Sequence, residues 1–350
     1  MGDIENSLQQ QVRDAADAQR ALRLHGHDSK AFYGNPVTGE ELDLGAHSGV
    51  VSYEPTELVL SARGGTPLSE IEQLLADNGQ RLTFEPPHFA DHGTIGGAVA
   101  SGLGGPARPW GGAPRDVMLG CKLLDGQGRV LTFGGQVMKN VAGYDISRLM
   151  AGAHGTLGIL LEVSLKVLPA VAKTRSLALE MPREAAQRRM RELARQPLPL
   201  SGAAYADGRL YLRLSGAHAS VNAWRERIGG ERLAENNTFW QRLRDQQLDF
   251  FNDPRPLWRL SLAGNAPRLG CEQDVILDWG GAQRWLLSEQ PGKEIRRQVA
   301  QHGGHAELFR RGDSRDDFAP LSPALLQLHR QLKKRFDPNG ILNPGRLFSD

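Results

Sequence analysis

The feature that most constrains the fold of this chain is a glycine-dense segment at residues 93–105. Six of its thirteen residues are glycine, and the 350-residue chain contains 41 glycines. Glycine permits positive φ angles and lets a ligand approach the backbone closely, but it weakens a helix. We therefore predict a loop here, and little helix anywhere between residues 93 and 120. A surface loop without function is the alternative, although the apolar residues Ile95, Val99 and Leu103 indicate that the loop is anchored.

Glycine-rich segments bind phosphate groups in two common ways. A helix can begin directly after a glycine-rich turn, or several loops can point backbone N–H groups at the anion. The sequence has no G-x-G-x-x-G motif between a strand and a helix, and it has no P-loop motif. The second arrangement is therefore favoured, with residues 25–30 and 93–105 as the candidate loops.

The remaining pattern indicates alternating helices and strands. Helices are predicted at residues 8–24, 66–79, 183–196 and 219–228 and from Ser322 onward, and strands at Leu22–Leu24, Glu57–Ala62 and Leu157–Val167 and in a hairpin over Cys121–Phe133. Thr66 is the expected N-cap of the second helix, with Pro67 at its first position. Pro169 is expected to end the last strand, and Leu325, Leu328 and Leu332 share one face of the last helix.

Charge and hydropathy exclude several classes of protein. The chain has 42 basic and 40 acidic side chains, a formal net charge of +2, so we expect no nucleic-acid partner, because phosphate binding needs clustered basic residues. The first residues are acidic, and no apolar run reaches the length of about 18 residues that a membrane helix requires. We therefore expect no signal peptide and no transmembrane segment, and a cytoplasmic location. Peripheral attachment to the inner membrane through a partner remains open.

The two cysteines limit the redox chemistry of the chain. Cys121 and Cys271 lie far apart in the sequence. They could form a disulfide, but two free thiols are favoured. Because a typical iron–sulfur cluster takes about four cysteine thiolates, we predict that this chain cannot hold one alone.

Four stretches resemble the vanillyl-alcohol oxidase, or PCMH, family of FAD-binding proteins. Residues 53–87 resemble the first half of the FAD-binding domain, and residues 93–120 and 139–169 resemble its central part. The run QLKKRFDPNGILNPGRL at 331–347 is similar to the end of the D-2-hydroxy-acid dehydrogenase branch. VTGEELDLGAHSGVVSYEPTELV and GGQVMKNVAGYD narrow the resemblance to the E subunits of glycolate oxidases.

This resemblance implies an α+β fold and a division into domains. Two α+β subdomains would hold an extended FAD, and a smaller α+β cap domain would cover the isoalloxazine. Residues 1–170 would form the PCMH-type FAD-binding domain and residues 171–305 the cap. Residues 306–350 would form a C-terminal segment that returns to the FAD domain.

The resemblance also implies where FAD binds. The loop at 25–30 would contact the pyrophosphate, residues around 94–102 would line the pyrophosphate and the flavin, and 155–159 would reach the adenosine end and the flavin edge. The implied cofactor-binding residues are His25, Gly26, His27, Asp28, Ser29, Lys30, Pro87, Thr94, Ile95, Gly96, Gly97, Ser101, Gly102, Gly155, Gly158 and Ile159. Lys139, Tyr144 and Asp145 have either a structural or a cofactor role.

His27 raises the question of a covalent flavin. The run Arg23-Leu24-His25-Gly26-His27 resembles the R-x-G-G-H spacing of relatives whose histidine is joined to FAD. The glycolate oxidase branch holds FAD non-covalently, and we therefore expect the non-covalent form here.

The catalytic motifs of the hydroxy-acid branch are missing. Those enzymes carry an H-x-H-x-G-N-like stretch and a later E-H-G, and this sequence has neither. We expect His305 to lie in a solvated turn, His329 to be exposed on a helix, and Trp258 and Trp279 to lie in a core. We therefore predict no metal site and assign no catalytic residue.

The resemblance implies an FAD-dependent oxidoreductase that acts on the CH–OH group of 2-hydroxy acids as part of a complex. The chain would be the FAD-binding subunit of a glycolate oxidase, which converts glycolate to glyoxylate. Its implied partners are a related FAD-binding D subunit and an iron–sulfur F subunit toward which electrons pass. The alternatives are a self-sufficient FAD-dependent dehydrogenase of another small 2-hydroxy acid, and a structural subunit without cofactor.

Overall fold

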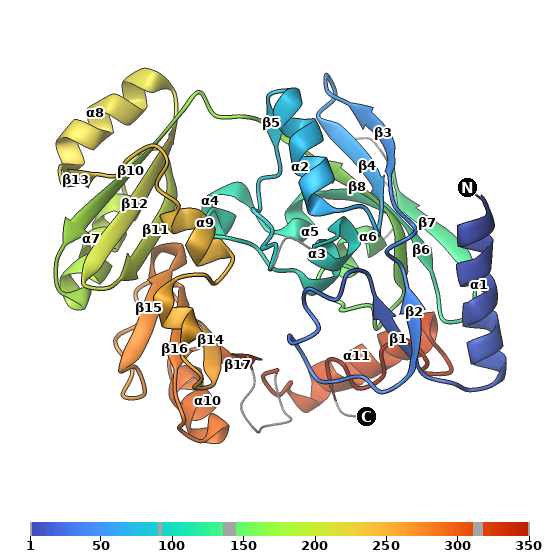
Figure 1. Ribbon diagram of the computed structural model, residues 1–350. Coiled ribbons are helices and arrows are strands. Elements are labelled where there is room, and N and C mark those ends of the chain that lie inside the picture. The colour runs from blue at the N-terminus through green and yellow to red at the C-terminus, as the bar shows by residue number, and fades with distance from the viewer. Residues whose placement is uncertain (1, 90–92, 136–144, 311–317, 349–350) are drawn as a thin grey trace. The chain divides into compact units, whose positions relative to one another are not determined.

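The chain divides into two compact units, whose elements are labelled in Figure 1. The computed structural model describes residues 2–89, 93–135, 145–310 and 318–348. Unit 1 comprises Met1–Gly104, Gly112–Ala170 and Pro320–Asp350, and unit 2 comprises Gly105–Gly111 and Val171–Ala319. Each unit combines helices with a β-sheet, so the predicted α+β class is confirmed.

Unit 1 is built on an antiparallel sheet. Its helices are α1 (Gly2–Asp17), α2 (Leu68–Asp77), α3 (Ile95–Ser101), α5 (Pro114–Val117), α6 (Ile146–Leu149) and α11 (Pro323–Phe336). Its strands are β1 (Leu22–His25), β2 (Glu40–Asp43), β3 (Val50–Glu54), β4 (Val59–Arg63), β5 (Gln80–Arg81), β6 (Met118–Leu124), β7 (Val130–Gly134), β8 (Ile159–Lys166) and β9 (Leu168–Pro169). Strands β3-β4-β8-β6-β7 form the antiparallel sheet in that order, whereas β1 and β2 pair in parallel.

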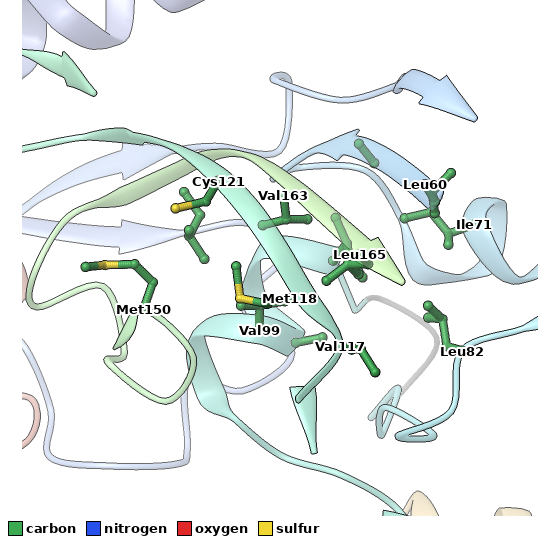
Figure 2. Close-up of a cluster of buried hydrophobic side chains, with 14 of the residues drawn as sticks. Leu60, Ile71, Leu82, Val99, Val117, Met118, Cys121, Met150, Val163 and Leu165 are labelled. Atoms are coloured by element: carbon green, nitrogen blue, oxygen red, sulfur yellow. The ribbon is translucent and has the colours of Figure 1, made fainter. Parts of the chain in front are cut away.

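Two hydrophobic clusters pack against the sheet of unit 1. The first includes Leu60, Ile71, Val99 and Met118 and is drawn in Figure 2. The second joins Leu8 and Val12 of α1 to Ile159 and Leu161 of β8. Because β8 supplies both clusters, its first three residues are all buried, and apolar and polar positions alternate only from Glu162 onward.

Several predicted elements of unit 1 are confirmed. The hairpin forms between β6 and β7, and the carboxylate of Asp125 accepts hydrogen bonds from the backbone N–H groups of Gln127 and Arg129 in its turn. Helix α11 begins after Ser322, whose hydroxyl accepts a hydrogen bond from the Leu325 N–H. His329 is exposed on this helix, as predicted.

Three local predictions in unit 1 are wrong at the boundaries. Helix α1 covers Gly2–Asp17 rather than residues 8–24. Thr66 is not an N-cap, because its hydroxyl donates a 2.7 Å hydrogen bond to the Arg63 carbonyl, and Pro67 occupies the cap position of α2 instead. Pro169 does not end the pairing of strands, since it lies in β9 and pairs with Gln80 of β5.

The prediction of a loop at residues 93–105 is also wrong. Residues Ile95–Ser101 form α3, with Thr94 as N-cap: the Thr94 side chain accepts a hydrogen bond from the Gly97 N–H. Ile95, Ala98 and Val99 are fully buried in the first cluster. The N-cap and the burial of this apolar face outweigh the low helix propensity of glycine. Gly102, at φ +65°, ends the helix.

Unit 2 is built on an antiparallel sheet with the strand order β13-β10-β12-β11-β15-β16-β14-β17. Its strands are β10 (Lys173–Glu180), β11 (Leu200–Ala206), β12 (Arg209–Gly216), β13 (Glu231–Arg232), β14 (Leu257–Ser261), β15 (Asp274–Asp278), β16 (Gln283–Leu287) and β17 (His305–Arg310). Its helices are α4 (Arg108–Gly111), α7 (Arg183–Ala194), α8 (His218–Ile228), α9 (Phe239–Arg244) and α10 (Gly292–Ala300), with short 3₁₀ turns at Asp249–Asn252 and Trp279–Gly281. The helices predicted at 183–196 and 219–228 correspond to α7 and α8.

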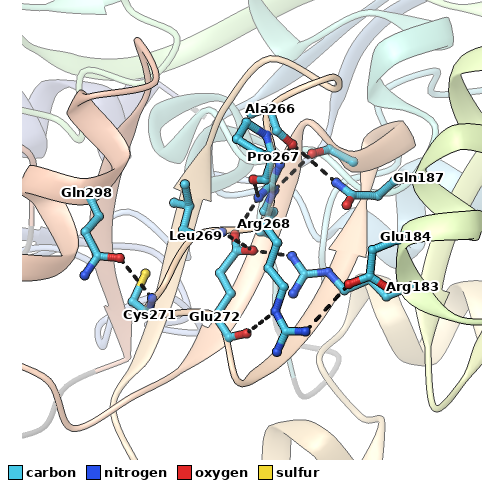
Figure 3. A network of polar contacts seen from close by, with 12 residues as sticks. Arg183, Glu184, Gln187, Ala266, Pro267, Arg268, Leu269, Cys271, Glu272 and Gln298 are labelled. Carbon is cyan, nitrogen blue, oxygen red and sulfur yellow. Dashed lines mark hydrogen bonds and ion pairs between the residues drawn. The ribbon is translucent and has the colours of Figure 1, made fainter.

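A buried ionic network lies inside unit 2 (Figure 3). The guanidinium of Arg284, fully buried, donates to Glu272 Oε1 at 2.6 Å and to the carbonyl of Ala266 at 2.6 Å. Arg183 donates to the other carboxylate oxygen of Glu272. Buried charges are tolerated only when paired and hydrogen-bonded in this way. The network fixes the segment between Ala266 and Glu272 against α7 and β16.

The structure confirms the predicted core position of one tryptophan and the predicted free state of both cysteines. Trp258 is buried in a core of unit 2, as predicted. Trp279 is only half-buried, so the prediction that it lies in a core is wrong; its indole N–H donates to the Gly105 carbonyl at 3.0 Å. Cys121 and Cys271 are both free and buried, as favoured. Burial raises the pKa of Cys121 to about 12 and that of Cys271 to about 11.

Among the residues that the structure describes, no helix combines the length and apolar character needed to cross a bilayer.

Candidate cofactor site

The segment that follows β1 lines a cavity of about 120 Å³ in unit 1, which we call the loop cavity. Its lining includes all of residues 25–30, which were predicted to contact a pyrophosphate, and Thr94, Gly97 and Ser101 of the α3 region. It also includes Arg23, from the run that resembles R-x-G-G-H, and residues not predicted to bind the cofactor, namely Tyr33, Ala100, His154, Asn343 and Arg346.

Ion pairs hold the loop at residues 25–30. Arg23 donates two hydrogen bonds to the Asp28 carboxylate, at 3.0 and 2.8 Å, and one to Glu41 at 2.9 Å. These bonds from Arg23 lower the pKa of Asp28 below its usual range. Asp28 is therefore ionised at neutral pH, and its ion pair keeps the Arg23 guanidinium next to the turn that follows β1.

The C-terminal run Leu342–Arg346 closes the same loop from the other side. Asn343 accepts a 2.8 Å hydrogen bond from the Leu24 N–H and donates one of 2.8 Å to the His154 carbonyl. Arg346 donates to the carbonyls of Lys30, Ala31 and Asn35 at 3.0–3.3 Å. The loop is therefore positioned by residues more than 300 positions away in sequence.

A second cavity, of about 100 Å³, lies next to the loop cavity and shares His25, Gly26, Thr94, Gly97 and Asn343 with it. We call it the inner cavity. Its lining adds Leu44, Gly64, Gly96, Met150, Ala153, Gly155, Gly158, Ile159 and Leu160. The predicted segments at 25–30, 94–97 and 155–159 are thus brought together at one site.

The backbone N–H groups at the start of α3 already have hydrogen-bond partners within unit 1. The Ile95 N–H donates to the Thr66 carbonyl and the Gly96 N–H to the Gly64 carbonyl, both at 2.9 Å. A Cβ atom at position 96 would lie 2.7 Å from the Gly64 carbonyl oxygen, so only glycine permits this approach. Because these two N–H groups already have partners, hydrogen bonds to an anion must come from other groups, such as the loop at residues 25–30.

Three of the predicted cofactor residues do not line either cavity. Ile95 is buried in the first hydrophobic cluster, and Gly102 forms the C-cap of α3. Pro87 is buried in the segment that follows β5. These three residues have packing or chain-turning roles in the structure, and direct contact of all sixteen predicted residues with FAD stays a prediction.

The chemistry of the lining suits an anionic, hydrogen-bonding ligand. Lys30 and Arg346 supply positive charge at the loop cavity, whereas the charge of Arg23 is compensated by Asp28 and Glu41. His25 Nε2 is buried and, within the described residues, makes no hydrogen bond; Glu41 Oε2 lies 3.6 Å away. A buried polar atom without a partner is costly, so a ligand that hydrogen-bonds to it is favoured. The residues present therefore fit a dinucleotide such as FAD.

A third cavity of unit 1, about 550 Å³, lies beside α11. We call it the helix cavity. It shares Ala153, Asn343 and Arg346 with the cavities above, and its lining adds Arg115, Arg148, Leu149, Leu157, His329, Arg330, Leu332 and Phe348. Its lining is mainly apolar, with cationic side chains among the apolar ones.

Of the remaining candidate residues of the sequence, those that the structure describes line neither the loop cavity nor the inner cavity. Asp145 caps α6, accepting a hydrogen bond from the Arg148 N–H. Lys139 and Tyr144 lie outside the described residues. His305 is exposed but lies in β17 rather than in the predicted turn. No group of three or more His, Cys, Asp or Glu side chains suited to a metal ion occurs in the part of the chain that the structure describes.

Comparison with known families defines the class. Residues 4–134 match a model of the FAD binding domain, and residues 319–347 match the C-terminal domain of FAD linked oxidases. These matches include the loop at 25–30, α3, and the Asn343 and Arg346 that close the site. The chain is therefore an FAD-binding protein of the FAD-linked oxidase class.

Individual relatives narrow the class to a family. The glycolate oxidase subunit GlcE of Escherichia coli (strain K12) is 49% identical over 348 residues, covering 99% of this chain and 98% of that protein. A D-lactate dehydrogenase of Archaeoglobus fulgidus is 29% identical over 138 residues, covering 39% and 31%. The glycolate oxidase subunit GlcD of Bacillus subtilis (strain 168) is 34% identical over 100 residues, covering 28% and 21%. The chain belongs to the family of GlcE, which confirms the resemblance read from the sequence.

Solved structures support the fold alone. An alkyldihydroxyacetonephosphate synthase superimposes with a TM-score of 0.68 at 15% sequence identity, covering 96% of this chain and 74% of that one. Since most residues differ, the likeness concerns the arrangement of the elements and not the chemistry.

Proposed function

We propose that this chain is the FAD-binding subunit of a complex that oxidises glycolate to glyoxylate. The observation that carries the proposal is the 49% identity to GlcE over nearly the whole of both chains. The charged loop cavity and the adjoining inner cavity, lined by three segments of unit 1 and by Asn343, support it.

FAD bound to this chain would supply the capacity to take up electrons and pass them on. The chain would hold and orient it. The loop at residues 25–30, with the cations Lys30 and Arg346, would neutralise the pyrophosphate, and the Arg23–Asp28 pair would hold the loop in place. His25 Nδ1 donates to the Gly26 carbonyl at 3.0 Å, so Nε2 of the neutral ring would accept a hydrogen bond from a ligand hydroxyl or N–H group. Asn343 would keep the loop and the segment at His154 at a constant separation.

Electrons would leave this chain toward an iron–sulfur subunit. The chain has two cysteines, one in each unit, both buried and with raised pKa values, whereas a typical cluster takes about four thiolates. We further propose that a related FAD-binding subunit of the GlcD kind oxidises glycolate, and that the present chain holds FAD and relays electrons. The complex would work in the cytoplasm or at the inner membrane surface.

The visible absorption spectrum of the purified chain, alone and co-expressed with its partner subunits, tests the first step. We expect flavin bands from the chain alone, with all flavin released into the supernatant on acid denaturation. A folded but colourless chain in both preparations would exclude a flavin-holding role and favour a structural subunit.

Glycolate turnover with an artificial electron acceptor tests the division of labour. We expect turnover from the complex and none from the chain alone. Turnover by the chain alone would instead establish a self-sufficient dehydrogenase.

A further inference from the structure

Helix α11 carries an apolar stripe that is covered at one end only. Leu325, Leu328, Leu332 and Phe336 are spaced three or four residues apart and share one face of the helix. Leu332 and Phe336 pack against the first hydrophobic cluster of unit 1. Leu325 and Leu328 are 49% and 50% exposed, the highest values among the exposed large apolar side chains of the described residues.

Single exposed apolar residues are normal on protein surfaces. Here Leu325 and Leu328 lie on the same face as the packed residues Leu332 and Phe336. The next residues of α11, among them His329, Arg330 and Leu332, line the helix cavity. An apolar surface next to a recess is typical of a protein-binding site, where an anchoring side chain fills the recess.

The basic residues of α11 and of the helix cavity indicate the charge of the protein that would bind here. Helix α11 contains Arg330, Lys333, Lys334 and Arg335 and no acidic residue. Within the described residues Arg115 and Arg330, which both line the helix cavity, form no ion pair with an acidic side chain. Arg148, in contrast, is paired with Asp145 at 3.0 Å. Two cations that line an apolar recess and have no acidic partner among the described residues favour a docking protein that supplies carboxylates.

We propose that Leu325, Leu328, Arg330 and Arg115, here called the α11 surface, form the docking site for another subunit of the complex. The occupant is an acidic protein segment that inserts an apolar side chain into the helix cavity and covers the two leucines. This inference rests on the proposed membership of a glycolate-oxidising complex.

Two other occupants fit less well. A lipid surface needs an apolar face along the length of an amphipathic helix, whereas the C-terminal half of this stripe is packed, and a bilayer would not fill a recess. A small ligand confined to the helix cavity would leave Leu325 and Leu328 in water, because neither lines that cavity.

The test measures capture of the partner subunits by the tagged chain in co-expressed cells. One variant combines Leu325→Glu with Leu328→Glu, and a second combines Arg115→Glu with Arg330→Glu. The matched control is Ile4→Glu, which changes another exposed apolar residue on a helix, 39% exposed on α1. We expect both double variants to weaken capture about tenfold or more, and the control to leave it unchanged.

The flavin content and melting temperature of each variant, purified without partners, separate docking from folding. We expect the double variants to keep both. If charge reversal unfolds the chain, Leu325→Gln with Leu328→Gln provides a milder test with the same expected direction.

Each remaining outcome has one meaning. Unchanged capture by both double variants would overturn the docking site while leaving the complex intact. Loss of flavin in the Arg115→Glu, Arg330→Glu variant would assign the recess to the cofactor instead. A dimer of the lone chain that Leu328→Glu separates would make a second copy the occupant. A wild-type chain that captures no subunit at all would refute the proposed function itself.

Discussion

Asn343 and Arg346 show that single side chains connect distant parts of the sequence at this site. Asn343 has a φ of +42°, a conformation that asparagine tolerates better than most residues. From this position it bonds at once to the backbone at Leu24 and at His154. The geometry of the candidate cofactor site therefore depends on one amide group.

Replacing that amide tests this dependence. We expect Asn343→Ala to weaken FAD binding about tenfold, equivalent to about 1.4 kcal/mol, because both hydrogen bonds are lost. Asn339→Ala is the matched control, since Asn339 makes one exposed hydrogen bond, to the Ala16 carbonyl, in the same segment. Titration of apoprotein with FAD gives the affinities, and equal values for the two variants would contradict the clamping role.

Asp28 makes the site sensitive to acid. Its folded-state pKa lies below the usual value because Arg23 hydrogen-bonds to the carboxylate. The stabilisation is therefore fully present above the unfolded-state pKa of about 3.9 and is lost as pH falls through the lower folded-state value.

We accordingly expect the contribution of Asp28 to flavin retention to be constant from neutral pH to about pH 5 and to be lost below about pH 4. Asp28→Asn should make the acid-induced release less steep, whereas Asp77→Asn on α2 should not. The release of flavin as a function of pH is measured by the fluorescence of the free flavin. Identical release curves for wild type and Asp28→Asn would show that the pair does not hold the loop.

At the scale of elements, α3 depends on close approach to the backbone of Gly64. We expect Gly96→Ala to destabilise unit 1 by about 1–3 kcal/mol, as overpacking does, because the new Cβ would lie 2.7 Å from the Gly64 carbonyl oxygen. Gly97→Ala is the control in the same helix: its Cβ would meet only Thr94 Oγ1, at 3.1 Å. Denaturant unfolding of both variants measures the difference, and equal stabilities would contradict this account of α3.

Sequence patterns predicted elements whose signals are local. The hairpin turn at Asp125 and the start of the last helix at Ser322 each depend on neighbouring residues, and both are found. Helix α3 was missed because its stability comes from burial against β4 and β8, which glycine content does not reveal. Asn343 and Arg346 were missed because their partners lie far away in the sequence, 189 residues for His154 and more than 300 for the others, although the LNPGR run had contributed to the family resemblance.

At the scale of the whole molecule, the two units have separate cores, and the residues of the candidate cofactor site all belong to unit 1. Glu272 is buried in unit 2 and bonds to both Arg183 and Arg284. Removing one charge from such a group leaves the other charges buried and uncompensated, at a cost of about 3–5 kcal/mol.

We therefore expect Glu272→Gln to lower the stability of unit 2 while the flavin spectrum is retained. Glu294→Gln, which removes a partly exposed pair with Arg297, should change stability by less than about 1 kcal/mol. Tryptophan fluorescence during unfolding reports on unit 2, because all six tryptophans of the chain lie in it. Loss of flavin in Glu272→Gln at a temperature where unit 1 stays folded would show that the site also needs unit 2.

The closure of the loop at residues 25–30 by Asn343 and Arg346 has a consequence for biosynthesis. During translation, all of unit 2 emerges before these two residues do, so its core can form while the loop is still open. A nascent chain truncated anywhere before residue 343 lacks the hydrogen bonds of Asn343 and Arg346 to the loop, however much of the glycine-rich segment it contains. Loading of the cofactor is therefore expected to be among the last events in the maturation of the protein.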